Sequence, residues 1–313
     1  MSTASIEIDR VEIADPRLRR RAIWISILAG FLLTVVWSYT FVDSVIGGTI
    51  ADTLLGQEAS TTALTGPVMG IVFAFVSGLA GTFTACNIAG MSAVAPMMAR
   101  GEKVTAKGTA KAMLAPLGWL SAGMVAVAAV YGALGVAFAD NLPQLSTEVT
   151  GAGMPVRLVQ SSVVFGIVGL AFAYLGLAAL KVVPDVFAKI RERYPHTDVV
   201  VLGMLIGAFL IGRPFPLFHK MFEYAASTGS PLLGAGTFVL QAIGNIAIMA
   251  VIFVLVFGLA GTRISRWLQA SPGRVGRFTG GALLLAGSFT FLYWVLRVPS
   301  IFGYGWWPTA PWS

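Results

Sequence analysis

The sequence predicts an all-α integral membrane protein with seven transmembrane helices. Its apolar residues occur in blocks of about 20 or more, the length that a helix needs to cross the roughly 30 Å hydrocarbon layer. Only 11% of the residues are charged, whereas an average soluble domain carries about 25%. The mean hydropathy of +0.82 and the 36 glycines fit closely packed membrane helices. The alternation of short apolar strands with charged helices that marks a soluble α/β protein is absent.

Seven apolar blocks define the expected spans. They cover residues 22–42, 67–91, 114–139, 158–182, 199–222, 232–259 and 278–298. Several exceed the length of a straight crossing, so we expect tilt or internal breaks. The polar first 20 residues lack the apolar core and cleavage site of a signal peptide, so the first block is expected to remain as a helix.

The basic residues predict the orientation. They cluster at residues 10–21, 100–111, 181–193 and 263–277, which are the N-terminal tail and the loops after the second, fourth and sixth spans. Because Lys and Arg gather on the cytoplasmic side, we expect a cytoplasmic N-terminus and an extracytoplasmic C-terminus in the cell (inner) membrane. The same clusters, facing anionic lipid, explain the net charge of +7 without a nucleic-acid partner.

The chain is expected to contain no separate soluble domain. Residues 1–66 form a basic tail, an extra N-terminal helix and an outer loop, and residues 67–298 form the main transmembrane domain. That domain divides into halves at about 67–183 and 199–298, and residues 299–313 form an aromatic tail at the outer interface.

The second span contains small and polar residues around the only cysteine, Cys86. Thr84 and Asn87 flank it, and small residues and hydroxyls suit close helix packing or a helix break. Cys86 is then either a small buried residue in a packing face or part of a polar cavity, which the membrane amide of Asn87 favours.

The fifth span contains Arg213, Pro214 and Pro216. Each proline removes a backbone donor and clashes with the preceding turn, so the helix should break here. A charge inside a span is costly and marks a candidate functional site, although Arg213 could also extend toward the outer interface or contact carbonyls freed by the break.

Gln241 and Asn245 lie one turn apart on one face of the sixth span. They either form interhelical hydrogen bonds or line a polar cavity. His196 and His219 are far apart in the sequence and no catalytic set or phosphate loop is present, so we expect no metal, no cofactor and no stand-alone enzyme.

The second and fifth spans each open a unit of three helices, and the two units have opposite topology. Broken helices at matching places predict an inverted repeat with a site near the membrane midplane. At these segments the chain resembles the CcdA/DsbD transmembrane family. Thr84-Ala85-Cys86 is similar to its first Pro-Cys site, with Ala85 in place of proline, and residues 211–216 are similar to its second, with Phe215 in place of cysteine.

This resemblance implies a role in cytochrome c biogenesis and thiol–disulfide electron transport. Family members form a disulfide between their two broken helices, whereas this chain has one cysteine. Cys86 would therefore act through a mixed disulfide with an exported thioredoxin-like or cytochrome maturation partner, with Arg213 lowering its pKa. The alternatives are a small-solute transporter whose path includes Asn87, Arg213, Gln241 and Asn245, and a subunit that anchors partners in the membrane.

Overall fold

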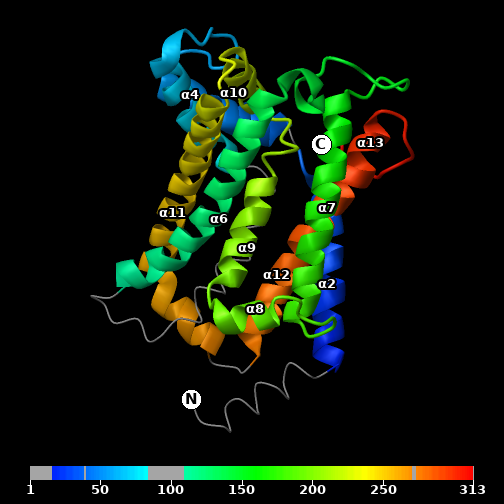
Figure 1. Ribbon diagram of the computed structural model, residues 1–313. Coiled ribbons are helices and arrows are strands. Elements are labelled where there is room, and N and C mark those ends of the chain that lie inside the picture. The colour runs from blue at the N-terminus through cyan, green and yellow to red at the C-terminus, as the bar shows by residue number, and fades with distance from the viewer. Residues whose placement is uncertain (1–15, 39, 84–108, 270–272, 313) are drawn as a thin grey trace.

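The computed structural model describes residues 16–38, 40–83, 109–269 and 273–312, and in this part the chain is helical apart from one β-bridge between Val149 and Pro155 (Figure 1). The all-α fold class is confirmed. The helices are α2 (Pro16–Val36), α3 (Thr49–Leu55), α4 (Gly66–Ala80), α6 (Thr109–Ala137), α7 (Val156–Ala179), α8 (Ala188–Arg193), α9 (Thr197–Ala208), α10 (Pro216–Ser227), α11 (Pro231–Gln269), α12 (Arg274–Phe291) and α13 (Val298–Ile301).

Four helical segments in the described ranges are long and apolar enough to cross a membrane. They are Pro116–Ala137, Val156–Ala179, Pro231–Leu255 and Arg274–Ile301, and Pro16–Val36 with Thr40–Leu55 makes a fifth if this bent pair is one span. These helices are those of a multi-pass membrane protein. The expected second and fifth spans are represented by the shorter apolar helices α4 and α9, so the count of seven stays a prediction.

Two boundaries differ from the expected ones. The first helix begins at Pro16 instead of residue 22, because arginine is a good helix former and its long side chain can reach the interface. The helix also ends at Val36, and the outer loop expected at 43–66 contains a π-helical turn, Thr40–Gly48, followed by α3. The division into domains stays a prediction.

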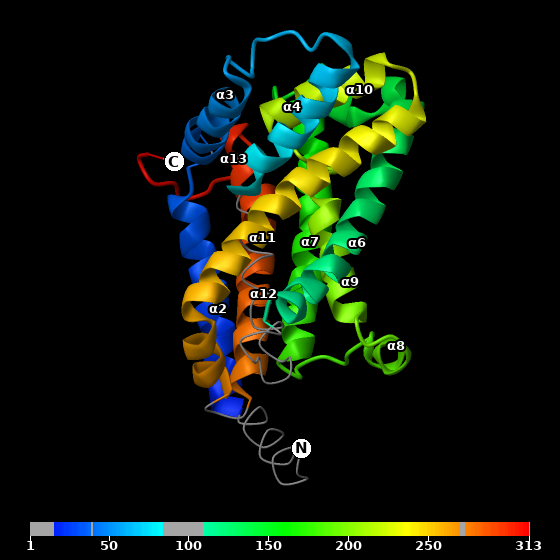
Figure 2. The same ribbon diagram turned by 90° about the vertical axis from the view of Figure 1, so that its left-hand side faces the viewer.

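The helices pack in a continuous bundle (Figures 1 and 2). Helix α12 packs against α7 and α2, while α11 packs against α6 and α4, and α9 packs against α6. An edge-to-face aromatic cluster of Tyr131, Phe218, Phe222 and Phe238 fills the space between α6, α10 and α11. A second buried cluster, which includes Phe165, Phe172, Phe209 and Met249, joins α7 and α9 to α11 and α12.

Hydrogen-bond donors cover the carbonyl end of α2. The Arg297 guanidinium is buried and donates to the carbonyls of Thr34 and Trp37. The backbone N–H of Ala310 and the indole of Trp312 donate to the carbonyls of Val35 and Val36. The last carbonyls of a helix have no partner within the helix, so the C-terminal tail and Arg297 together complete this end.

Glycines allow the closest approaches between helices. A Cβ added to Gly78 of α4 would overlap the carbonyl of Gln241, and one added to Gly203 of α9 would overlap the carbonyl of Leu120. In a membrane, where the surrounding lipid is as apolar as the helices, such close packing is a main source of helix association.

We therefore expect Gly203→Ala to lower the free energy of unfolding by about 1–3 kcal/mol, because the new methyl group must push α9 away from α6. Gly118→Ala is the matched control, since a Cβ there meets nothing within 4 Å. The control should leave stability unchanged or raise it by about 0.5–1 kcal/mol. Unfolding of the purified proteins in one detergent measures both, and equal stabilities for the two variants would contradict the packing argument.

Candidate functional site

The expected helix break is present in residues 209–215. Helix α9 ends at Ala208, the chain continues in tight turns, and α10 begins at Pro216 with Phe215 as its extended N-cap. Pro216 occupies the first helical turn, where a missing N–H costs nothing, while Pro214 lies in the non-helical segment. The two prolines thus separate α9 from α10, as the sequence predicts.

The carbonyls of the break accept hydrogen bonds from side chains of neighbouring elements. Ile211 O accepts from Tyr131 Oη at 3.2 Å and Gln160 Nε2 at 2.7 Å, Gly212 O accepts from Ser161, and Arg213 O accepts from Gln144. Because water does not reach freed carbonyls in an apolar layer, protein donors must satisfy them. Gln160 and Ser161 are polar residues of the expected fourth span. Tyr131 and Gln144 were not singled out, because an aromatic residue and a loop amide give no local signal.

Arg213 connects this break to the end of α4. The residue is only 6% exposed, and its guanidinium Nη2 donates a hydrogen bond to the carbonyl of Gly81. The guanidinium carbon also lies 5.6 Å from the ring centre of Phe215 and 5.9 Å from that of Phe218. A Cβ added to Gly81 would overlap the guanidinium, so a larger residue at this position would displace the Arg213 side chain. Arg213 therefore contacts a carbonyl at a helix end, and its functional reading stays a prediction.

The end of α4 also contacts the polar residues of α11. After Ala80 the chain makes one 3₁₀ turn, Gly81–Phe83, and Thr82 Oγ1 lies 3.1 Å from the carbonyl of Gly78 and 3.3 Å from that of Asn245. Gln241 and Asn245 are both buried. Neither side-chain polar atom of Gln241 has a hydrogen-bond partner in the described part of the chain.

We call Gly81, Thr82, Arg213, Gln241 and Asn245 the broken-helix site. The structure brings together three residues singled out in the sequence, Arg213, Gln241 and Asn245, and adds Gly81 and Thr82. The remaining candidates, Thr84, Cys86 and Asn87, lie outside the described residues. The site combines a buried positive charge with hydroxyl and amide groups.

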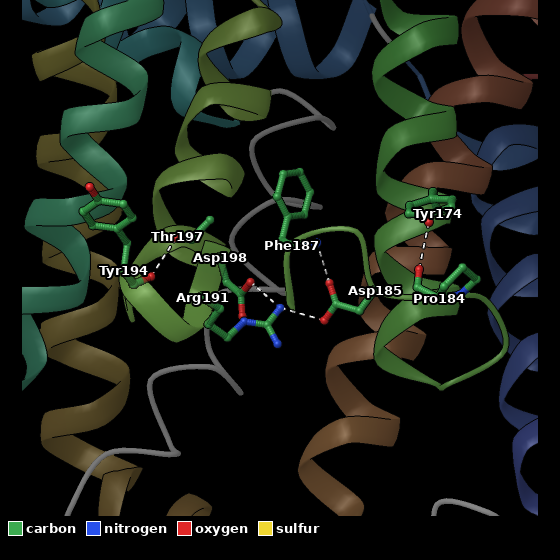
Figure 3. A network of polar contacts seen from close by, with 8 residues as sticks. All are labelled: Tyr174, Pro184, Asp185, Phe187, Arg191, Tyr194, Thr197 and Asp198. Carbon is green, nitrogen blue, oxygen red and sulfur yellow. Dashed lines mark hydrogen bonds and ion pairs between the residues drawn. The ribbon is translucent and has the colours of Figure 1, made fainter. Parts of the chain in front are cut away.

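A second polar cluster lies in the connection between the two halves of the chain (Figure 3). Arg191 Nη2 contacts Asp185 at 2.8 Å and Asp198 at 2.6 Å, and thereby joins the segment after α7 to the first turn of α9. Partial burial alone would lower the pKa of Arg191, but the hydrogen bonds and charges of Asp198 and Asp185 outweigh it and raise that pKa. Arg191 therefore stays charged and holds the connection in one conformation.

The described residues contain no group of three or more His, Cys, Asp or Glu side chains arranged to hold a metal ion. Comparison of the chain with family models, with curated proteins and with solved structures finds no match.

The contact between Arg213 and Gly81 predicts a measurable coupling. Arg213→Met should lower the free energy of unfolding by about 1.5–3 kcal/mol, because it removes a charged donor from a buried carbonyl. Gly81→Ala should cost about 1–3 kcal/mol, because its methyl group displaces the guanidinium. The double variant should lose less than the sum, since the shorter methionine leaves room for the methyl group.

Arg297→Met supplies the control for this comparison of single and double variants. Its guanidinium caps α2 instead of α4, so its loss should add to that of Gly81→Ala without coupling. Additive losses for Arg213→Met with Gly81→Ala, measured by unfolding in detergent, would contradict a direct contact between the two residues.

Proposed function

We propose that this chain is a membrane transport protein built from two inverted repeats, and that the broken-helix site lies on the path of a small solute. In this proposal α4, α6 and α7 of the first half correspond to α9, α11 and α12 of the second. The helix contacts support the correspondence. If each helix is replaced by its counterpart, the α4–α11 contact becomes the α9–α6 contact, and both are present. The α6–α11 and α7–α12 contacts each join two counterparts, so the replacement leaves them unchanged.

The positions of the glycines support the same correspondence residue by residue. Gly78 meets the carbonyl of Gln241, and its proposed counterpart Gly203 meets the carbonyl of Leu120. In the opposite sense, Gly244 meets the carbonyl of Phe75, and Gly123 meets that of Val200. The same difference in residue number relates Gly78 to Gly203 and Phe75 to Val200, which are residues of α4 and α9. A second constant difference relates Gly123 to Gly244 and Leu120 to Gln241, which are residues of α6 and α11.

The third pair of helices follows the same rule. Gly169 of α7 packs against Gly287 of α12, and Gly176 packs against Gly280. A single shift relates Gly169 to Gly280 and Gly176 to Gly287, so exchanging the halves converts one contact into the other. Two unrelated halves would have no reason to place glycines at all of these matching contacts.

The glycine contacts also support opposite directions for the two halves. Gly78 meets Gln241 and Thr82 contacts Asn245, so α4 and α11 run parallel. Gly203 meets Leu120 and Gly207 meets Met124, so α9 and α6 also run parallel. Gly132 meets Phe238 and Gly234 meets Val136, so α6 and α11 run antiparallel. This single antiparallel step leaves α4 and α9 running in opposite directions, as an inverted repeat requires.

The observation that carries the transport proposal is the contact between the two helix ends. Arg213, in the break that follows α9, donates to Gly81 at the end of α4. Inverted-repeat transporters bind solute where discontinuous helices meet between the repeats. The polar groups of Thr82, Gln241 and Asn245 at this point would give a solute its contacts, and Gln241 has unused hydrogen-bonding capacity among the described residues.

Access of water to the site tests this proposal. Asn245→Cys and Gln241→Cys, each made in a Cys86→Ser background, should react with a membrane-impermeant thiol reagent added to sealed vesicles, because a solute path must open to water. Ile243→Cys is the matched control on the same helix, since Ile243 is 42% exposed on the outside of the bundle and would face lipid. Absence of labelling at 241 and 245 in vesicles of both orientations would show a sealed packing contact and overturn the transport proposal.

A thiol–disulfide role in cytochrome c maturation is the second candidate. The observation that favours it is that Arg213 contacts Gly81, which precedes Cys86 in the same predicted span. A nearby guanidinium would favour the thiolate form that attacks a partner's disulfide. This candidate keeps the resemblance to the CcdA/DsbD family, with the second thiol supplied by a partner protein.

Covalent haem staining of membranes from a deletion strain distinguishes the two candidates. If the thiol role is correct, staining should be lost in the deletion, restored by the wild-type chain, and not restored by Cys86→Ser. Alkylation of Cys86 should also slow in Arg213→Met, with Arg297→Met as the control. Unchanged staining in the deletion would exclude the maturation role and leave the transport proposal intact.

A further inference from the structure

The corner between α7, α8 and the start of α2 has an unusual backbone. Lys181 follows Leu180, the C-cap of α7, and is exposed, with a φ of 57°. The N–H of Lys181 bonds to Ala178 and that of Val182 to Leu177, which closes the end of α7. Glycine is the usual residue in this left-handed position because it has no Cβ. A lysine kept in a strained conformation indicates a role for its side chain.

A second basic residue meets Lys181 from another helix. Arg19, in the first turns of α2, donates from Nη1 to the carbonyl of Lys181 at 3.4 Å. This contact places the Arg19 guanidinium at the backbone of Lys181, although the two residues are far apart in the sequence. The start of α2 adds the exposed residues Arg17, Arg20 and Arg21.

Apolar side chains are exposed next to these charges. Val182, Val186, Ile190 and Tyr194 are 43%, 57%, 47% and 59% exposed. They belong to the connection that contains the short helix α8, which runs across the end of the bundle instead of along it (Figures 1 and 2). Apolar side chains and basic groups side by side in a crosswise segment are typical of a structure lying at a lipid–water interface.

The charge of this corner is positive and favours an anionic surface. Lys189 and Arg193 are exposed on the α8 segment together with one exposed carboxylate, Glu192. The other carboxylate of the segment, Asp185, is held by Arg191. The exposed charges that remain are therefore mostly cations, located where phosphate groups of a bilayer would lie.

We propose that this corner binds the headgroup of an anionic phospholipid. Lys181 and Arg19 contact the phosphate, and the exposed apolar residues of the α8 segment enter the acyl-chain boundary. The proposal rests on insertion in a membrane and is independent of the transport proposal. It explains why a lysine occupies a backbone position that usually holds glycine. It also explains why the apolar residues of the α8 segment are exposed, because they would contact lipid.

Lipid binding by the purified full-length chain tests the proposal. Native mass spectrometry in detergent, with dioleoyl phosphatidylglycerol or dioleoyl phosphatidylcholine added, should show preference for the anionic lipid. Lys181→Asn with Arg19→Gln should weaken phosphatidylglycerol binding by about fivefold for each charge removed, since ~1 kcal/mol is typical for a basic residue near an anionic surface. Asparagine tolerates the left-handed conformation, so the fold should be retained.

Two further variants make the result decisive. Lys181→Gly relieves the strain and removes the charge, so it should be at least as stable as wild type and still bind the anionic lipid more weakly. Arg157→Gln removes a charge at the opposite end of α7 and should leave binding unchanged. The proposal is overturned if Arg157→Gln weakens binding as much, if both lipids bind equally, or if inorganic phosphate displaces the lipid at equal concentration.

Discussion

The structure depends on one constraint, which is that every backbone group freed at a helix break must find a donor or acceptor away from water. The breaks meet this demand in the same way. The Arg297 guanidinium donates to the end of α2, and Arg213 donates to the end of α4. Carbonyls of the break after α9 accept side-chain hydrogen bonds from α6, from α7 and from the loop between them. Positive charge is also favoured at a helix C-terminus by the helix dipole. These contacts determine which helices lie together around the broken-helix site.

The sequence predicted the break because its cause is local. Pro214 and Pro216 exclude a regular helix whatever surrounds them. Arg213 was a candidate for the same reason, since a charge in an apolar block stands out. The donors Tyr131 and Gln144 come from distant parts of the chain, so their role depends on tertiary contacts that no local pattern records. The start of α2 was placed too late because a hydropathy window stops at the arginines, whereas the helix continues through them.

Glycine explains why the proposed relation between the halves is faint in the sequence. A packing glycine contributes no side chain, so the residues that face it need only a backbone, and their identities can differ. In the proposed correspondence Leu120 and Gln241 occupy matching positions. One is apolar and the other is an amide, but both offer a carbonyl to a glycine. The contacts of Gly78 and Gly203 therefore match while the sequences around them do not. The opposite topology predicted from the order of the spans rested on the count of helices alone.

Arg213 and Arg297 together show what a buried guanidinium does in this chain. Both cap the carbonyl end of a helix, so capping alone is sufficient reason for an arginine in an apolar layer. The difference lies in the partner. Helix α2, which Arg297 caps, lies outside the parts that the transport proposal exchanges, whereas Arg213 and Gly81 belong to opposite proposed repeats. If the repeats move relative to each other, the Arg213–Gly81 hydrogen bond must break or move with both helix ends, and a solute group could replace the carbonyl as its acceptor. The Arg213–Gly81 hydrogen bond would then have two roles. It would stabilise the fold, and it would be replaced by a hydrogen bond to the solute during transport.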